Sequence, residues 1–136
     1  MAAQHSPRIE QLCEAARARV TEVSAKELAI RQAEPAPLHL IDVREDHEWA
    51  LGHLPGAEHL GKGIIERDIE RRIPDRDADI VLYCGGGYRS ALATDALNQM
   101  GYTRVRSLAG GFRGWQDAGR PIVDVSVGSP DPAARR

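Results

Sequence analysis

One short segment of the chain combines a cysteine, three glycines and an arginine. Residues 84–90 (CGGGYRS) follow the apolar run DIVLYC (79–84) and lead into a stretch that suits a helix. The glycines allow successive backbone N–H groups to turn inward as an anion-binding nest, and the helix adds the positive end of its dipole. Together with the permanent cation of Arg89, these features would stabilise the thiolate of Cys84, the nucleophilic form of cysteine. The segment therefore predicts covalent chemistry at Cys84, against the alternative of an inert cysteine buried at a strand end.

Other anion-binding loops fit residues 84–90 less well. A Walker phosphate loop places Gly-Lys-Ser/Thr before its helix, and this loop has no lysine. The consecutive glycines also lack the spacing of a dinucleotide-binding fingerprint. Cysteine phosphatases pair a cysteine with an arginine, but they typically use one residue more than the four between Cys84 and Arg89. The shorter loop makes a smaller ring of N–H donors, which suits one sulfur atom better than a phosphate group.

Strands and helices alternate around this loop. Short apolar runs predict buried strands, and the spacing of apolar residues with capping signals predicts helices. This alternation indicates an α/β fold in which a parallel sheet is covered by helices on both faces, and ligands bind beyond the carboxyl ends of such strands. The expected strands are residues 20–23, 38–43, 57–60, 79–84 and 104–108, and the expected helices are residues 7–20, 24–30, 45–51, 64–73, 90–100 and 112–118.

The composition is that of one globular domain. The chain has 136 residues, of which 42% are hydrophobic and 28% are charged. No apolar run approaches the ~20 residues of a membrane-spanning helix. The N-terminus carries no apolar secretory signal, so we expect a cytoplasmic protein without a membrane partner. The net charge of −2 argues against nucleic-acid binding through bulk charge.

The cysteines and histidines do not suggest a metal site. Two cysteines are too few for a disulfide-rich scaffold or a four-cysteine zinc site. The three central histidines lie six residues apart, which is not metal-ligand spacing on a helix or a strand, so no metal or cofactor is expected. Residues 80–136 hold four acidic and seven basic residues, a net charge of +3. This basic part is either a solvated surface or the surroundings of a small anionic ligand.

Four motifs resemble those of rhodanese-like sulfurtransferases. Residues 84–90 resemble the active-site loop Cys-x-x-Gly-x-Arg-Ser/Thr, and LIDVRE (40–45) resembles the early Asp-x-Arg motif. GHLPGA (52–57) resembles the Gly-His-Ile-Pro-Gly-Ala turn, and LAGGF (108–112) with Trp115 resembles the late Gly-Gly-Phe/Trp motif. The resemblance covers most of the chain and implies a parallel five-stranded sheet flanked by helices. The division that it implies is an N-terminal helical extension (1–20), a rhodanese-like domain (21–123) and a C-terminal tail (124–136).

The resemblance implies sulfur transfer through Cys84. The thiolate would attack the sulfane sulfur of a small anionic donor such as thiosulfate, carry it as a persulfide, and pass it to cyanide or a thiol. The loop residues implied to hold the outer sulfur or the substrate are Gly85, Gly86, Gly87, Tyr88 and Arg89, and the implied supporting residues are Asp42, Arg44 and Ser90.

Several alternatives stay open. Some thiosulfate-using relatives carry basic side chains just after the cysteine, where this chain has Gly85 and Gly86. A protein persulfide or a small persulfide would suit this uncharged approach equally well, and the protein would then be a carrier or interaction module in a sulfur relay. A cysteine-dependent phosphatase or arsenate reductase is a third hypothesis. The N-terminal helix either packs on the domain or mediates dimerisation, and Cys13 on its apolar stripe is expected to be buried.

Overall fold

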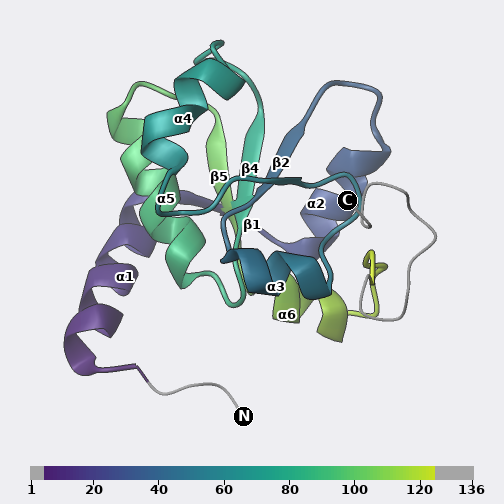
Figure 1. Ribbon diagram of the computed structural model, residues 1–136, viewed down its shortest axis with the longest axis horizontal. Coiled ribbons are helices and arrows are strands. Elements are labelled where there is room, and N and C mark those ends of the chain that lie inside the picture. The colour runs from purple at the N-terminus through teal and green to yellow at the C-terminus, as the bar shows by residue number, and fades with distance from the viewer. Residues whose placement is uncertain (1–4, 125–136) are drawn as a thin grey trace.

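Five short strands form one parallel sheet in the computed structural model, which describes residues 5–124 (Figure 1). The strands lie in the order β1-β5-β4-β2-β3, and each runs parallel to its neighbours. The central strand β4 is buried along its whole length, which explains its uninterrupted apolar sequence IVLY. The strands are β1 (Thr21–Val23), β2 (His39–Asp42), β3 (Glu58–His59), β4 (Ile80–Tyr83) and β5 (Val105–Leu108).

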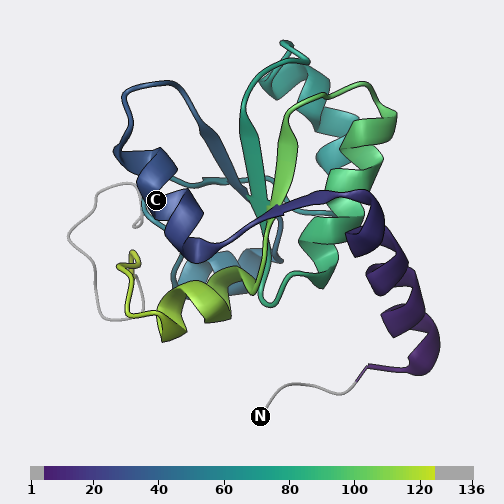
Figure 2. The same cartoon turned by 180° about the vertical axis from the view of Figure 1, so that it is seen from behind.

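Helices cover both faces of the sheet, as the sequence predicts (Figures 1 and 2). Side chains alternate between the faces along each strand. Ile80 and Leu82 of β4 therefore pack with residues of α4 and α5, whereas Val81 and Tyr83 pack with residues of α2 and α6. The helices are α1 (Pro7–Arg19), α2 (Ala25–Ala33), α3 (Asp46–Leu51), α4 (Ile65–Arg72), α5 (Tyr88–Gln99) and α6 (Gly111–Asp117).

Two helix ends differ from the sequence expectations by more than one residue. Helix α5 begins at Tyr88 rather than at residue 90, because Gly87 adopts a left-handed conformation (φ +111°) directly before it. Ser24 and Glu27 form a capping box at the start of α2, and this helix continues to Ala33 rather than ending at the expected residue 30.

The N-terminal helix α1 packs on the domain alongside α5 (Figure 2). Arg19 near its end binds Asp95 of α5 at 2.8 Å, and the Tyr88 hydroxyl donates a hydrogen bond to Glu14 at 2.8 Å. Cys13 is buried as expected, whereas its neighbour Leu12 is 54% exposed. Helix α1 is therefore attached to α5, the helix that begins at the cysteine loop.

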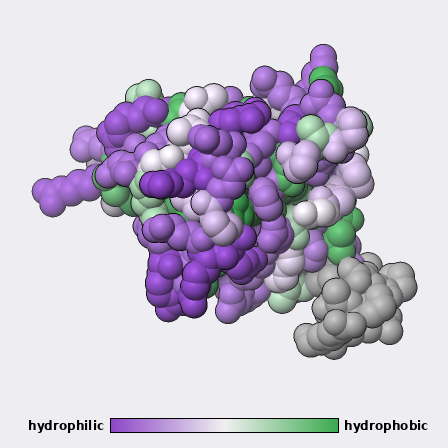
Figure 3. Space-filling model, turned by 90° about the horizontal axis from the view of Figure 1, so that it is seen from above, coloured by the Kyte–Doolittle hydropathy of each residue, from purple (hydrophilic) through white to green (hydrophobic). Residues whose placement is uncertain are grey.

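The surface opposite the cysteine loop is largely polar. Figure 3 views the molecule from above Figure 1 and shows a mostly hydrophilic face on which apolar residues form small, separate groups. No helix within residues 5–124 has both the length and the apolar character required to cross a membrane. The expected C-terminal tail, apart from Asp124, falls outside the described residues.

Candidate active site

Cys84 directly follows the central strand, at the carboxyl end of the sheet. Its sulfur accepts a hydrogen bond from the backbone N–H of Gly87 at 3.1 Å, and its thiol donates to the Ser90 hydroxyl at 3.5 Å. Gly87 precedes α5 and Ser90 lies in the first turn of this helix. The sulfur therefore lies at the positive end of the helix dipole, and both the dipole and the N–H donor favour negative charge on it.

Ser107 is a neighbour of the site that the sequence did not reveal. Its hydroxyl lies 2.8 Å from that of Ser90, and both residues are fully buried. Ser107 belongs to β5, which pairs with β4 and thereby brings this hydroxyl beneath the loop. Nothing in the sequence RVRSL (104–108) marks Ser107 as a site residue, because only the pairing of β5 with β4 places it there.

The start of α6 holds the cysteine loop from the other side. The N–H of Phe112 donates to the Cys84 carbonyl at 2.8 Å, and the N–H of Arg113 donates to the Gly85 carbonyl at 3.0 Å. Gly111 makes this approach possible, because it has a left-handed φ of +57° and a Cβ there would lie 2.5 Å from the Cys84 oxygen. The segment that carries the Gly-Gly-Phe motif therefore holds the cysteine loop through backbone hydrogen bonds.

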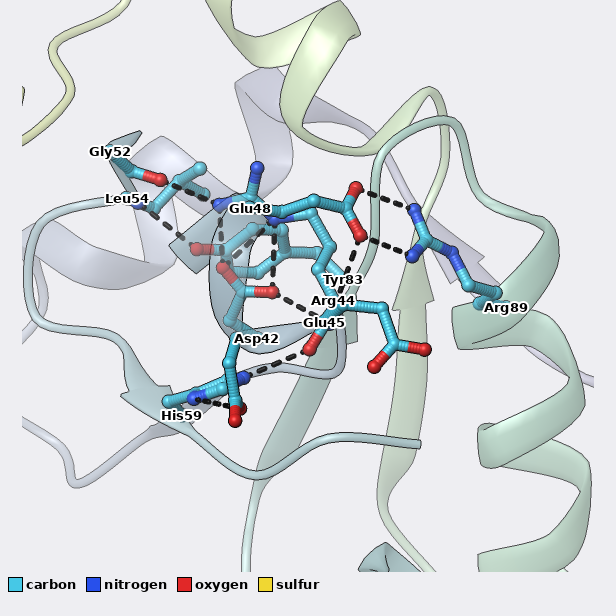
Figure 4. Close-up of polar contacts among 10 residues, drawn as sticks. Asp42, Arg44, Glu45, Glu48, Gly52, Leu54, His59, Tyr83 and Arg89 are labelled. Atoms are coloured by element: carbon cyan, nitrogen blue, oxygen red, sulfur yellow. Dashed lines mark hydrogen bonds and ion pairs between the residues drawn. The ribbon is translucent and has the colours of Figure 1, made fainter. Parts of the chain in front are cut away.

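Arg89 is bound by a carboxylate (Figure 4). Its two terminal nitrogens contact the two oxygens of Glu48 on α3 at 2.6 Å and 3.0 Å. These hydrogen bonds favour the ionised carboxylate and lower the pKa of Glu48 to about 2. The positive charge of Arg89 is thus largely balanced by Glu48. The sequence did not mark Glu48 as a site residue, because the pair is separated by 41 positions and meets only in the fold.

Asp42 and Arg44 hold the segment that carries Glu48. Both are buried, and the guanidinium of Arg44 binds the Asp42 carboxylate at 2.8 Å and the Gly52 carbonyl at 2.6 Å (Figure 4). Arg44 also lies 4.3 Å from the centre of the Phe112 ring on α6. The pair thus ties the end of β2 to the end of α3 and to α6.

A cavity of about 580 Å³ opens beside Cys84. Helix α1 forms one wall, and the cysteine loop, α5 and α6 form the others. Burial and the nearby charge of Cys84 raise the pKa of the Cys13 thiol, which belongs to the α1 wall. The cavity is lined by His5, Ile9, Cys13, Arg17, Cys84, Gly86, Tyr88, Arg89, Leu92 and Arg113.

The approach to Cys84 past Gly85 and Gly86 is not uncharged, contrary to the sequence expectation. The guanidinium of Arg113 lies against both glycines, so that a Cβ on Gly85 would be 2.9 Å from its Nη1 atom. Sequence reasoning missed Arg113 because it lies on another element, 24 positions after Arg89. Of the three glycines, Gly87 alone has a positive φ, so it is the one whose backbone conformation other residues resist.

No cluster of three or more histidine, cysteine or acidic side chains suited to a metal ion occurs within residues 5–124.

The residues that the sequence predicts for the site lie together at the carboxyl end of the sheet. Tyr88 and Arg89 line the cavity with Cys84, whereas Asp42 and Arg44 lie in the supporting network.

Comparison with known proteins places residues 24–118 under the model of the rhodanese-like domain. The chain is 38% identical over 104 residues to a sulfurtransferase of Allochromatium vinosum, a match that spans 76% of this chain and 95% of that protein. It is 36% identical over 92 residues to the thiosulfate sulfurtransferase GlpE of Pseudomonas fluorescens, spanning 68% and 81% of the two chains. A similar solved structure is a Rhodopseudomonas palustris protein described as of unknown function and a possible tyrosine phosphatase. It has a TM-score of 0.77 and 27% identity, and the match covers 90% of this chain and 98% of that one.

Proposed function

The chain belongs to the rhodanese-like domain family and is a rhodanese-type sulfurtransferase, and from this premise we propose that Cys84 carries the transferred sulfur as a persulfide. One observation carries the proposal. The Cys84 sulfur faces a cavity while accepting the Gly87 N–H at 3.1 Å at the start of α5. A thiolate held in this way is available as a nucleophile and has its charge stabilised by the loop.

In the first half-reaction the Cys84 thiolate attacks the outer sulfur of the donor. With thiosulfate, a bond forms between Cys84 Sγ and the sulfane sulfur, while the sulfur–sulfur bond of thiosulfate breaks. The bonding electron pair leaves with sulfite, and Cys84 becomes a persulfide anion. No external oxidant or reductant takes part, because the sulfane sulfur moves between two nucleophiles.

In the second half-reaction an acceptor attacks the outer sulfur of the persulfide. Cyanide yields thiocyanate, and a thiolate yields a new persulfide; in both cases the electron pair of the broken bond returns to Cys84 Sγ as a thiolate. The loop N–H groups and the start of α5 stabilise the anion in each state of this cycle. The Ser90 hydroxyl lies 3.5 Å from the Cys84 sulfur and is itself held by a hydrogen bond of 2.8 Å to Ser107.

The test is turnover of thiosulfate and cyanide, measured as thiocyanate, by the full chain and by Cys84→Ala. We expect the Cys84→Ala variant to lose thiocyanate formation, whereas Cys13→Ala, which removes the other thiol, serves as the matched control. Intact-mass measurement after thiosulfate treatment should show one added sulfur atom that is absent in Cys84→Ala. Unchanged activity in Cys84→Ala would refute the role of Cys84.

A carrier role in a sulfur relay gives a different result in the same experiments. A carrier would acquire one sulfur atom from a persulfide donor and release it to a thiol, but would turn over thiosulfate and cyanide poorly. The cavity beside Cys84 has room for organic donors larger than thiosulfate. A cysteine phosphatase is tested with an aryl phosphate, for which the four-residue spacing between Cys84 and Arg89 leads us to expect no Cys84-dependent turnover.

A further inference from the structure

We propose that Arg113 of α6 is the specificity-determining residue that binds the negatively charged group of the sulfur donor. This inference rests on the proposed function of Cys84 and names the class of donor: sulfane-sulfur compounds that carry an oxyanion, either a sulfonate or a carboxylate.

The three arginines around the cavity differ in whether a carboxylate binds them. Arg17 is bound by Glu22 at 3.1 Å, and Arg89 is bound by Glu48 at 2.6 Å. The side chain of Arg113 makes no hydrogen bond or ion pair with any residue from 5 to 124. Of the three arginines that line the cavity, Arg113 is therefore the one whose donors and charge are not already used within the described part of the chain.

Arg113 also lies close to the nucleophile in the fold. The guanidinium of Arg113 lies against Gly85 and Gly86, the two residues that follow Cys84. A Cβ on Gly86 would overlap with Nη2 of Arg113, and a Cβ on Gly85 would lie 2.9 Å from Nη1. Neither glycine has a positive φ, so the backbone itself would accept other residues here. The absence of side chains at 85 and 86 thus provides the space that the Arg113 guanidinium occupies.

The backbone of Arg113 is fixed to the cysteine loop. Its backbone N–H donates to the Gly85 carbonyl at 3.0 Å, next to the Phe112 N–H that binds the Cys84 carbonyl at 2.8 Å. The arginine therefore starts from a point attached to the cysteine loop itself. Its long side chain then reaches over the loop into the cavity that Cys84 faces.

The chemistry of the first half-reaction needs such a cation. A thiolate that attacks an anionic donor meets like-charge repulsion, which a cation next to both partners relieves. A guanidinium presents a planar fork of donors that matches two oxygens of a sulfonate or carboxylate. Cyanide and simple thiols, which attack in the second half-reaction, lack such an oxyanion group, so Arg113 should act mainly on the donor side.

The test compares Arg113→Gln with the parent protein on three donors: thiosulfate, mercaptopropionic acid persulfide and mercaptoethanol persulfide. The last two are similar in size and differ in the carboxylate. We expect kcat/KM for both oxyanion donors to fall about 10- to 100-fold, the range for loss of a charge-assisted hydrogen bond. The value for mercaptoethanol persulfide should change less than about threefold. Discharge of preformed Cys84 persulfide to cyanide, an anion without an oxyanion group, should change less than about threefold.

Two further variants separate specificity from folding. Arg113→Lys keeps the charge without the fork and should recover part of the lost kcat/KM for oxyanion donors. Arg71→Gln, on the exposed surface of α4, makes the same change in net charge away from the cavity and should behave as the parent. Gly86→Ala leaves Arg113 in the chain but displaces its guanidinium, so it should shift donor preference in the same direction as Arg113→Gln.

Equal losses on all three donors would overturn the proposal, because they would mean that Arg113 only supports the loop. An unchanged donor preference in Arg113→Gln, in a protein that still gains one sulfur atom at Cys84, would overturn the role of Arg113 and leave the proposed function intact. If the parent protein gained no sulfur from any of the three donors, both proposals would fall.

Discussion

Glu48 and Arg89 join α3 to the cysteine loop through two hydrogen bonds of 2.6 Å and 3.0 Å. A Cβ on Gly85 would lie 3.1 Å from Nη2 of this arginine, so the ion pair borders the loop directly. Behind it, the buried pair of Asp42 and Arg44 fixes the end of α3 through the Gly52 carbonyl. The position of the loop therefore depends on charged residues from three separate segments.

Glu48→Gln should reduce stability in a pH-dependent way. The pKa of Glu48 falls from its ordinary value of 4.5 to about 2 in the fold, mainly because Arg89 hydrogen-bonds to the charged form. A lowered pKa means that the ion pair contributes its full stability above pH 4.5 and loses it as the pH falls toward 2. At pH ~7 we expect the variant's free energy of unfolding to be lower by about 1 kcal/mol.

Urea unfolding of both proteins across this pH range measures the effect. The difference between them should shrink steadily below pH 4.5. Glu70→Gln, an exposed residue of α4, controls for the loss of one negative charge. A difference that stays constant down to pH 2 would contradict the assignment to this ion pair.

Gly111→Ala should destabilise the fold far more than Gly119→Ala. Both glycines have a left-handed φ, at +57° and +75°, and alanine in this region costs about 1–2 kcal/mol. At Gly119 the new Cβ would meet no atom within 4 Å, whereas at Gly111 it would lie 2.5 Å from the Cys84 oxygen. Relieving that overlap must separate α6 from the cysteine loop. Equal unfolding midpoints for the two variants in urea would show that the close approach is unimportant.

Asp42→Asn should be strongly destabilising. The Asp42 carboxylate is completely buried and accepts hydrogen bonds from both the side chain and the backbone N–H of Arg44. Neutralising it leaves the buried guanidinium of Arg44 without its counter-charge, for which a loss of about 3–5 kcal/mol is expected. Chemical denaturation followed by circular dichroism measures this loss. A loss below about 1 kcal/mol would mean that water or another group compensates Arg44.

Cys13→Ala should retain sulfur transfer. Burial and the nearby charge of Cys84 raise the pKa of the Cys13 thiol, so it stays protonated and unreactive near neutral pH. Thiocyanate formation from thiosulfate and cyanide should therefore remain within about twofold of the parent rate. A loss of about tenfold, in a variant with unchanged thermal stability, would instead make Cys13 a participant in the transfer.

The local sequence was sufficient to predict the sheet and the loop. The run IVLY is apolar at every position because β4 is buried on both faces, and such a short apolar run predicts a buried strand. Residues 84–90 are contiguous, so the contact between Gly87 N–H and Cys84 Sγ is a local one. The helix starts were less accurate, because the left-handed conformation of Gly87 lets α5 begin two residues before Ser90.

The sequence by itself thus determined the α/β architecture, the buried strand and the cysteine at its end, because these depend on short-range periodicity and on contiguous residues. Only the tertiary structure decided which charges surround that cysteine. It paired Arg89 with Glu48, placed Arg113 over Gly85 and Gly86, and brought α1 to the cavity wall. These relationships join residues on separate elements, whose distances are set by how the helices pack on the sheet rather than by their order in the chain.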